Sequence, residues 1–505
     1  MSSVALSLVP TGALETCSSA VTTAREAFRC LENWLLSQEV LGQPIHAVER
    51  EQRDKGREVM RLLLQAHIEA RGRGDVGRAV AVEKGEQVVC LTHRRKADRD
   101  LRTVFGRVDV RRLAYAFPDQ CSVHPIDERL QLAERSYSYE PTRLYVREAV
   151  KGPFSEAVET VNEQTGLKAS KRTVEEMVLD AAIDFEQFYE QRTVPAPETT
   201  GGIVVATVDC KGIPMLREEV QRRLAGAPAE RQSGVKQMAT VAAVYTVQPR
   251  PRTAEEVVES LFKDSTKPTI VTPLQSQKEA RPEHKRLWAS LDDGKEAVIK
   301  QAGAEVERRD PNQIKKRVAI TDGERALQDR VRRFLPTMLL ILDLLHVLER
   351  LWKVANVFCG SSKDAEADRE EWVRAQTLRL LNGQVSEVVR GIRQSATKRK
   401  LKGDPAKIVR KAAAYLYKNR GYMRYDEYLA AGLPIASGAV EGACKTLVKD
   451  RFERSGMRWG ETVEAMLKMR ALYLSGDFEE YWSFHVAEDQ KRLYGGRRWQ
   501  PILVD

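Results

Sequence analysis

Three aspartates of this 505-residue chain each come directly after a short apolar segment. Asp209 follows Ile203–Val208, Asp322 follows residues 318–321 and Asp343 follows residues 338–342. Such β-branched and aliphatic runs are typical of strands that are buried on both faces. A single aspartate in this position is more often a turn or helix-capping residue. Because ligands of open α/β sheets bind outside the carboxyl ends of strands, three such acids indicate a cation site.

A fourth acid, Glu441, lies in a segment for which we predict an amphipathic helix from Gly438 to Phe452. Its apolar positions follow helical spacing: Val440, Cys444, Leu447 and Val448. Lys445 and Lys449 continue a stripe that begins at Glu441, and an exposed ladder of ion pairs would explain this stripe equally well. Glycines at positions 438 and 442 flank Glu441, so that another chain or a ligand can approach the backbone closely.

Carboxylates gathered at one sheet edge would bind the hard cations Mg²⁺ or Mn²⁺ through oxygen alone. Two such ions about 4 Å apart activate an attacking hydroxyl and stabilise the leaving oxygen of a phosphodiester. The composition fits a nucleic-acid substrate, because 82 Lys and Arg against 72 Asp and Glu give a net charge of +10.

The residues around the four acids resemble one family. Asp209 in Val-Ala-Thr-Val-Asp-Cys-Lys-Gly, Asp322 in Ala-Ile-Thr-Asp-Gly, the Asp343-x-x-His346 pair and the long block from Glu441 to Trp459 are similar to a DDE transposase of a bacterial insertion sequence. The order of the acids and the Asp-x-x-His pair resemble the Mutator-like group and its Kra-type insertion-sequence family. The Glu441 block is the most specific part of this resemblance.

The resemblance implies an enzyme that binds element ends and catalyses metal-dependent DNA strand cleavage and strand transfer. Asp209, Asp322 and Glu441 would be the catalytic triad and would hold the Mg²⁺ or Mn²⁺ ions, of which we expect two. Asp343 and His346 would be accessory residues, with His346 orienting DNA or the scissile phosphate; a hydrogen-bonded core histidine fits His346 equally well. The expected partners are element ends, target DNA and further copies of the chain, because two ends must be held together.

The implied fold class is α/β. We expect a ribonuclease-H-like mixed sheet with flanking helices, preceded by a mainly helical DNA-binding region with a β-hairpin and interrupted by an all-α insertion. The predicted layout is a helical region at 1–85, a hairpin plus helix-turn-helix-like region at 86–192, a catalytic core at 200–360 and 436–475, a helical insertion at 361–435 and a tail at 476–505.

Patterning along the chain predicts the individual elements. Apolar residues at helical spacing predict helices within 20–80, 141–190, 253–262, 281–307 and 364–428. Alternation around Gly106 predicts a hairpin over 101–113. Apolar β-branched runs predict strands at 203–208, 237–247, 316–321 and 338–342, and strands interleaved with helices imply a partly parallel sheet. We expect the aromatic residues of the tail to pack back on the body.

Two groups of basic residues are predicted to contact DNA. A glycine turn at Gly166 and a capping Ser170 outline a helix-turn-helix, although an ordinary helical hairpin fits equally well. The first group lies at the start of the second helix: Lys168, Lys171 and Arg172. The second group lies in the Glu441 segment: Lys445, Lys449 and Arg451. The basic run Lys398–Lys402 would extend the path of the DNA.

Two short Cys/His pairs have spacings that suit zinc, Cys90-x-x-His93 and Cys121-x-x-His124. Relatives in the family often carry two Cys-x-x-Cys knuckles around the hairpin. The pairs here lack the usual flanking glycines, so we expect them to be metal-free relics or coincidences.

Several classes of protein are excluded by composition. No apolar stretch is long enough for a membrane span, residues 1–20 lack a basic leader and a clear cleavage site, and seven scattered cysteines fit a reducing compartment. We therefore expect a bacterial cytoplasmic protein associated with the nucleoid and not with a membrane. Two alternatives stay open: a non-catalytic DNA-binding protein or decayed transposase, and another ribonuclease-H-like nuclease that hydrolyses without strand joining.

Overall fold

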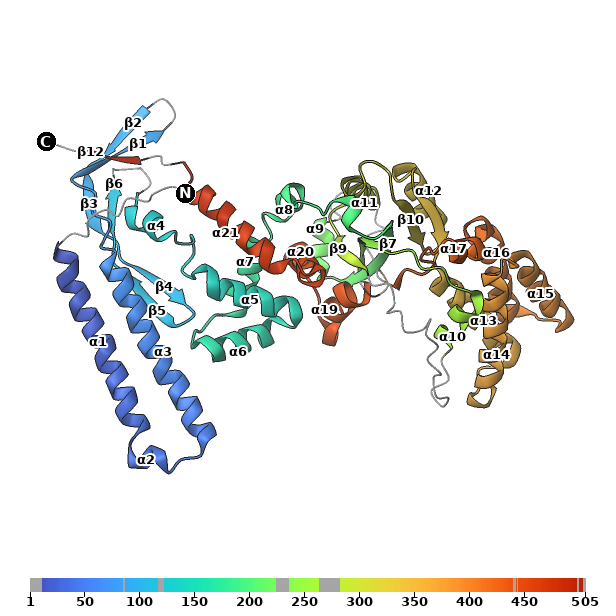
Figure 1. The fold of residues 1–505 in the computed structure, drawn as a ribbon, viewed down its shortest axis with the longest axis horizontal. Coiled ribbons are helices and arrows are strands. Elements are labelled where there is room, and N and C mark those ends of the chain that lie inside the picture. Colours follow the sequence, from blue (N-terminus) through green and yellow to red (C-terminus); the bar gives the residue numbers. More distant parts are fainter. Residues whose placement is uncertain are drawn as a thin grey trace. The chain divides into compact units, whose positions relative to one another are not determined.

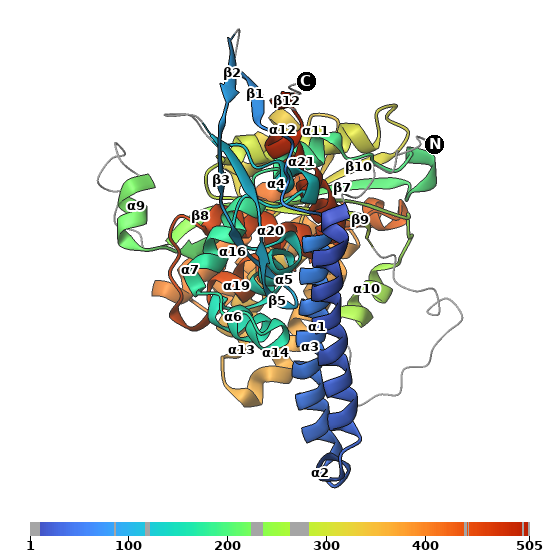
Figure 2. The ribbon, with the colours of Figure 1, turned by 90° about the vertical axis from the view of Figure 1, so that its left-hand side faces the viewer.

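The computed structural model describes residues 11–84, 87–116, 122–223, 236–262, 282–438, 442, 444–496 and 499–502. The chain divides into two compact units. The first unit comprises Met1–Glu190 together with Phe478–Asp505, and the second comprises Gln191–Asp477. Figures 1 and 2 show the elements of both units.

Two long helices begin the first unit. The helices α1 (Thr11–Leu35) and α3 (Ile45–Ala70) are joined by the short α2 (Gln38–Leu41) and lie side by side in both views (Figures 1 and 2). They confirm the helical pattern predicted for residues 20–80.

Short antiparallel strands follow the helical pair. The predicted hairpin is confirmed as β4 (Arg99–Thr103) and β5 (Gly106–Val110), with Gly106 at a φ of 118°. Five further strands of this unit lie outside the prediction: β1 (Ala79–Lys84), β2 (Gln87–Leu91), β3 (His93–Lys96), β6 (Leu113–Ala116) and β12 (Trp499–Ile502). The strand β12 pairs with β1, so the end of the chain completes a sheet that the first unit begins.

Helices complete the first unit: α4 (Pro125–Leu130), α5 (Tyr139–Lys151), α6 (Phe154–Thr165), α7 (Lys171–Ala181), α8 (Phe185–Gln191) and α21 (Phe478–Tyr494). The predicted turn and cap are present, because Gly166 ends α6 in the left-handed region and the Ser170 hydroxyl accepts a hydrogen bond from the Thr173 amide at 3.1 Å. The helix α21 packs against this unit, where the His485 ring and the Asp184 carboxylate are 2.7 Å apart.

The second unit is built on a five-stranded mixed sheet, which confirms an α/β fold. Its strands lie in the order β11 (Leu339–Leu342), β10 (Lys316–Thr321), β7 (Ile203–Pro214), β8 (Lys236–Val247), β9 (Glu283–Ser290). The strand β8 runs antiparallel to both β7 and β9, whereas β10 runs parallel to both β7 and β11. The predicted parallel part of the sheet is therefore present.

Two parts of this sheet differ from the prediction. The strand β7 continues past Val208 to Pro214, so Asp209 lies within the strand, opposite Val241 of β8. Residues 283–290, predicted as part of a helix, form the edge strand β9, and that prediction is wrong. The first half of β9 is charged and only its second half is buried, so neither an apolar run nor a regular alternation marks it as a strand.

Helices surround the sheet: α9 (Arg217–Arg223), α10 (Ala254–Leu261), α11 (Lys295–Arg309), α12 (Arg325–Phe334), α13 (Leu344–Cys359), α14 (Glu366–Leu381), α15 (Val385–Lys398), α16 (Gly403–Asn419), α17 (Tyr425–Ala430), α19 (Asp450–Phe452) and α20 (Val463–Ser475). One apolar core joins β7, β10 and β11 to α13 and to the helices α14–α17. The helical stretch after α13 is therefore packed against the sheet rather than against a core of its own.

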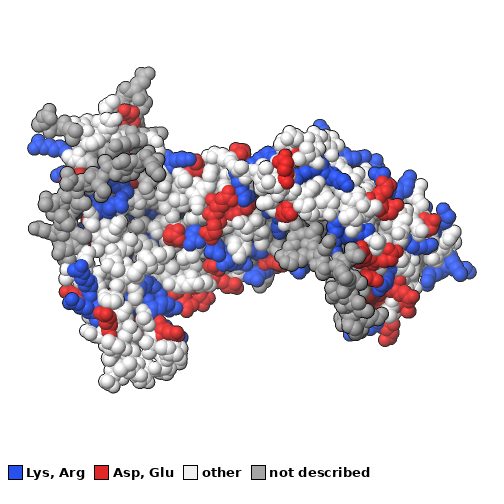
Figure 3. All heavy atoms as spheres, viewed as in Figure 1, with Lys and Arg blue, Asp and Glu red and all other residues white. Residues whose placement is uncertain are grey.

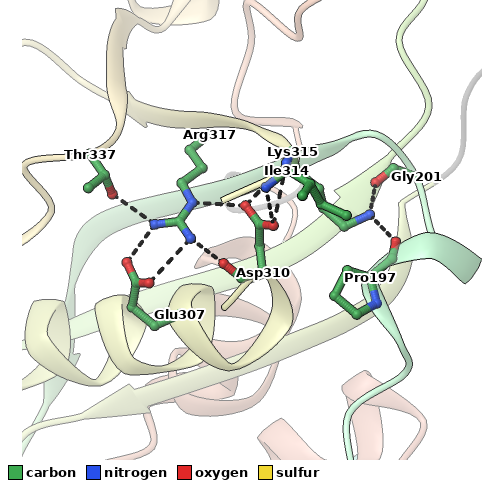
Figure 4. Close-up of polar contacts among 8 residues, drawn as sticks. All are labelled: Pro197, Gly201, Glu307, Asp310, Ile314, Lys315, Arg317 and Thr337. Atoms are coloured by element: carbon green, nitrogen blue, oxygen red, sulfur yellow. Dashed lines mark hydrogen bonds and ion pairs between the residues drawn. The ribbon is translucent and has the colours of Figure 1, made fainter. Parts of the chain in front are cut away.

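A buried polar network holds the starts of β7 and β10 together (Figure 4). Lys315 donates to the carbonyl oxygens of Pro197, Thr200 and Gly201 at 2.6–3.0 Å, just before β7 begins. The guanidinium of Arg317, in β10, binds the carboxylates of Glu307 and Asp310. Because a buried cation is stable only when it is paired, these contacts join the segments in which the two strands begin.

Within the described part of the chain, no helix is both long and apolar enough to cross a membrane.

Candidate active site

Asp209 lies within β7, and Asp322 directly follows the neighbouring parallel strand β10. Thr207 of β7 pairs with Ile320 of β10, so the next residues on the same face, two positions on, are Asp209 and Asp322. Both side chains are half-buried. Burial and the negative charge of Asp209 together raise the pKa of Asp322 above its ordinary value. The sequence therefore located two acids at one place, although Asp209 lies within its strand rather than at the end.

Backbone and side-chain contacts orient both carboxylates. Asp209 accepts hydrogen bonds from the amide of Cys210 at 2.7 Å and from the thiol of Cys444 at 3.2 Å. Asp322 accepts one from the amide of Glu324 at 2.9 Å, and its own carbonyl oxygen accepts one from the Tyr415 hydroxyl at 2.6 Å. These contacts hold each carboxylate in a defined orientation.

Asp343 lies at the start of α13 and is completely buried. One of its oxygens accepts hydrogen bonds from the amides of Leu345 and Ser437, and the other from the Ser437 hydroxyl and the His346 ring. Burial raises the pKa of Asp343, but the bonds from His346 and Ser437 outweigh burial and keep the pKa below its ordinary value. With both oxygens engaged by the protein, Asp343 acts as an anchor for its neighbours.

His346 takes a charged form in this arrangement. Its Nδ1 is 2.8 Å from Asp343, and this bond, together with the charges of Asp343, Asp322 and Asp209, raises the pKa of His346 to about 9 against the cost of burial. Because its side chain is 28% exposed, the ring belongs to the site and is not enclosed in the core. An imidazolium beside two carboxylates can contact an anionic ligand.

Glu441 lies outside the described residues, as do Ala439, Val440 and Ala443. The residues on both sides of this gap are anchored to the site. Ser437 is bonded to Asp343, and Cys444 is bonded to Asp209.

The residues after Cys444 depart from the predicted α-helix. Residues Cys444–Lys449 form a π-helix, in which hydrogen bonds link residues five apart, so the predicted stripe of residues four apart does not apply there. Arg470 of α20 is buried against this turn and donates to the carbonyl oxygens of Thr446 and Leu447. Further along, the backbone of Trp459 pairs with Pro214 and Leu216 near the end of β7. The segment after Glu441 is thus fastened to the strand of Asp209.

The donor set suits a hard divalent cation. Asp209 lies within β7 and Asp322 directly follows the neighbouring strand β10, and repulsion from Asp209 adds to the larger effect of burial in raising the pKa of Asp322. A bound Mg²⁺ or Mn²⁺ would relieve this repulsion through oxygen ligands alone. Among the described residues, no group of three or more His, Cys, Asp and Glu side chains is arranged to hold a metal ion, and Glu441 is outside that set.

Five of the six basic residues predicted to contact DNA are exposed, and the sixth, Arg451, is buried. Lys168, Lys171, Arg172, Lys445 and Lys449 are exposed. Lys171 and Arg172 lie near Glu175 and Glu176 one turn along α7.

Arg451 behaves differently from the other predicted DNA contacts. It is fully buried, with its guanidinium 4.7 Å from the ring of Trp459. A guanidinium enclosed in this way does not reach a phosphate, so we do not retain Arg451 among the DNA contacts.

Exposed basic side chains also occur in the run after α15. Lys398, Lys400 and Lys402 are exposed, whereas Arg399 is held over the ring of Phe358. On the face shown in Figure 3, Lys and Arg side chains are interspersed with Asp and Glu rather than gathered in one stripe.

The two Cys/His pairs lie in the first unit. Cys90 and His93 are exposed on β2 and β3, and His124 precedes α4. Burial and the positive charge of Arg112 lower the pKa of His124. Cys121 lies outside the described residues.

Three residues of the site were missed from the sequence: Ser437, Cys444 as a partner of Asp209, and Tyr415. Ser437 lies four residues before Glu441 and Cys444 lies three residues after it. This closeness in the sequence could have marked both as residues of the site. Tyr415 is separated from Asp322 by 93 residues, and no local pattern connects them.

A scan against protein families finds no match to this chain, and neither does a search of curated proteins. Among solved structures, the chain is similar to the Drosophila P element transposase strand transfer complex, with a TM-score of 0.26 and 9% sequence identity over 70% of this chain and 81% of that chain. A TM-score this low carries no argument about fold or function.

Proposed function

We propose that this chain is a DDE-type transposase with a ribonuclease-H-like core, which binds the ends of an insertion sequence and catalyses metal-dependent DNA strand cleavage and strand transfer. The mixed sheet supports this core, with three antiparallel strands and two further strands parallel to the first. The motif resemblance supports the family.

One observation carries the proposal. Asp209 and Asp322 are neighbours on adjacent strands, and the described residues on both sides of Glu441 are hydrogen-bonded to this same edge. Glu441 lies between Ser437 and Cys444 in the sequence. We propose Glu441 as the third carboxylate of the set.

In the proposed reaction, Asp209, Asp322 and Glu441 would hold the divalent cations. Two Mg²⁺ or Mn²⁺ ions bound there would lower the pKa of an attacking hydroxyl and stabilise the charge of the leaving oxygen. The protein contributes the orientation of the carboxylates through Cys210, Cys444 and Glu324. His346, held cationic by Asp343, orients the scissile phosphate through its second ring nitrogen.

DNA is the proposed partner of both units. Lys168, Lys171 and Arg172 would contact phosphates at the start of α7, and Lys445 and Lys449 would do so next to the catalytic edge. Two element ends must meet for strand transfer, so we propose that a homodimer or a larger assembly forms on DNA.

The test is metal-dependent nicking of DNA that flanks the coding sequence on both sides. Purified protein with Mn²⁺ should nick this DNA, and Asp209→Ala, Asp322→Ala and Glu441→Ala should each lower the rate by at least about 1,000-fold, because each removes a metal ligand. Asp404→Ala, which removes an exposed acid of α16, is the matched control and should leave the rate unchanged. Calorimetric titration with Mn²⁺ should show loss of metal binding in the first three variants.

The other outcomes separate the alternatives. Binding to the flanking DNA without any metal-dependent cleavage would indicate a non-catalytic DNA-binding protein. Cleavage products that never join to a second DNA molecule would indicate a nuclease. Unchanged nicking by Asp209→Ala would overturn the assignment of the triad.

A further inference from the structure

Arg350 lies on the same face of α13 as His346 and has no ion-pair partner among the described residues. The two residues are four positions apart, which places them one above the other on the helix, about 6 Å apart along its axis. The opposite face of α13 is buried through Leu344, Val347 and Leu351. Arg350 itself is half-buried, and among the described residues no carboxylate forms an ion pair with it.

The position of Arg350 is set by Tyr415 of α16. The guanidinium carbon lies 5.0 Å from the centroid of the Tyr415 ring, a favourable stacking geometry. The hydroxyl of the same ring donates to the carbonyl oxygen of Asp322 at 2.6 Å. One tyrosine therefore connects Arg350 to the turn that carries a proposed metal ligand.

A stacked guanidinium without a carboxylate partner keeps its N–H groups available for an external acceptor. The acceptor that arginine matches best in shape and charge is a carboxylate or a phosphate. The acids at this edge would be occupied by metal ions, so a phosphate from the substrate is the anion that reaches Arg350. Because Arg350 lies one helical turn beyond His346, it would reach a phosphate next to the one that His346 contacts.

We infer that Arg350 binds the backbone phosphate adjacent to the scissile phosphate and so positions the cut strand over the metal-binding carboxylates. This inference rests on the proposed function. Arg350 is a positioning residue, since it contacts a part of the substrate that does not react. Tyr415 supports it by restricting the guanidinium before DNA arrives.

The experiment combines substitution with neutralised phosphates. After the nick is mapped on the flanking DNA, duplexes spanning it are made with a single methylphosphonate at each position of the cut strand. In the wild type, a methylphosphonate at the contacted position should slow nicking by about 10- to 100-fold, the size expected for one charged hydrogen bond. Arg350→Ala should slow nicking of the unmodified duplex by a similar factor and show no further loss with that methylphosphonate.

The control is Arg374→Ala, which removes an exposed arginine from α14. It should nick at the wild-type rate and keep the wild-type sensitivity to every methylphosphonate. Arg350→Ala should also reduce the slope of the logarithm of DNA affinity against the logarithm of salt concentration by about 1, as loss of one phosphate contact does.

Two results would overturn the inference. If Arg350→Ala nicks at the wild-type rate, no phosphate contact is made. If Arg350→Ala and a methylphosphonate slow nicking by independent factors at every position of the cut strand, no single phosphate is contacted. Arg350 then acts only by packing on Tyr415. Both outcomes leave the proposed function intact, whereas a wild-type protein that does not nick at all would refute the proposed function itself.

Discussion

Asp343 and Asp209 are both acids next to the same edge, yet their surroundings give them different roles. Asp343 is fully buried and accepts bonds from His346, Leu345 and Ser437, so its oxygens are used within the protein. Asp209 is half-exposed and accepts bonds from one amide and one thiol. Burial raises the pKa of Cys444, so the thiol stays protonated and donates to Asp209 rather than repelling it.

The ion pair of His346 and Asp343 predicts a pH-dependent stability. The pKa of His346 is raised from its ordinary value of 6.5 to about 9, so this interaction stabilises the fold fully below pH 6.5 and is lost as the pH rises through about 9. The pKa of Asp343 is lowered, so its contribution to the free energy of unfolding is present at neutral pH. That contribution is lost as the pH falls and the carboxylate becomes protonated. Between pH 6.5 and 9.5 the free energy of unfolding of the second unit, measured by urea denaturation, should fall by about 1–3 kcal/mol.

The matched variants are His346→Gln and His46→Gln. The first removes the titrating ring and should flatten the alkaline fall. The second removes an exposed histidine of α3 and should leave the fall intact. The same alkaline slope in wild type and His346→Gln would show that another group causes the effect.

At the scale of single elements, the turn after β10 leaves no room for a side chain at Gly323. Gly323 has a φ of +86°, and a Cβ atom there would lie 2.7 Å from the Tyr415 hydroxyl and 2.8 Å from Leu342. Gly323→Ala should therefore lower the free energy of unfolding by about 1–3 kcal/mol through strain and collision. It should also slow nicking strongly, because the same turn carries Asp322.

The control for this variant is Gly391→Ala in α15. A Cβ atom at Gly391 meets nothing within 4 Å, and alanine favours the helix, so the variant should be more stable by about 0.5–1 kcal/mol. Thermal melting of both proteins measures the two effects. A Gly323→Ala protein with wild-type stability and rate would mean that the turn adapts to a side chain.

The sequence predicted elements well where one local pattern dominates. The strands β8, β10 and β11 each contain a continuous apolar run, and their predicted bounds match to within one residue. The edge strand β9 was missed because its charged half and its pairing with β8 are not visible locally. The π-helix at 444–449 was also missed, since its geometry depends on Arg470 of a distant helix.

The closeness of Asp209 and Asp322 could be predicted from the sequence, because apolar strands followed by an acid are local features. Their supporting contacts could not be predicted, because they join residues far apart in the chain, such as Tyr415 with Asp322 and Cys444 with Asp209. The burial of Arg451 illustrates the same limit. Its position in a basic segment indicated DNA binding, whereas tertiary packing against Trp459 encloses it.

At the scale of the whole molecule, the end of the chain belongs to the unit formed by its beginning. The buried Asp184 is paired with His485 and Arg492 of α21, and Tyr494 donates to the carbonyl oxygen of Leu132 at 2.6 Å. The strand β12 adds to β1. Removing residues 478–505 would take both His485 and Arg492 away from the Asp184 carboxylate, and breaking a buried ion pair by removing one side costs about 3–5 kcal/mol in proteins.

Deletion of residues 478–505 is therefore expected to unfold or strongly destabilise the first unit and to leave the second unit, 191–477, with its own melting transition. Differential scanning calorimetry and limited proteolysis with mass spectrometry distinguish the two units. Asp184→Asn in the shortened chain should restore part of the lost stability, because a neutral amide is less costly to bury than an unpaired carboxylate. If the first unit melts at the same temperature with and without α21, the helix is a dispensable tail and the division of the chain into these two units does not describe its folding.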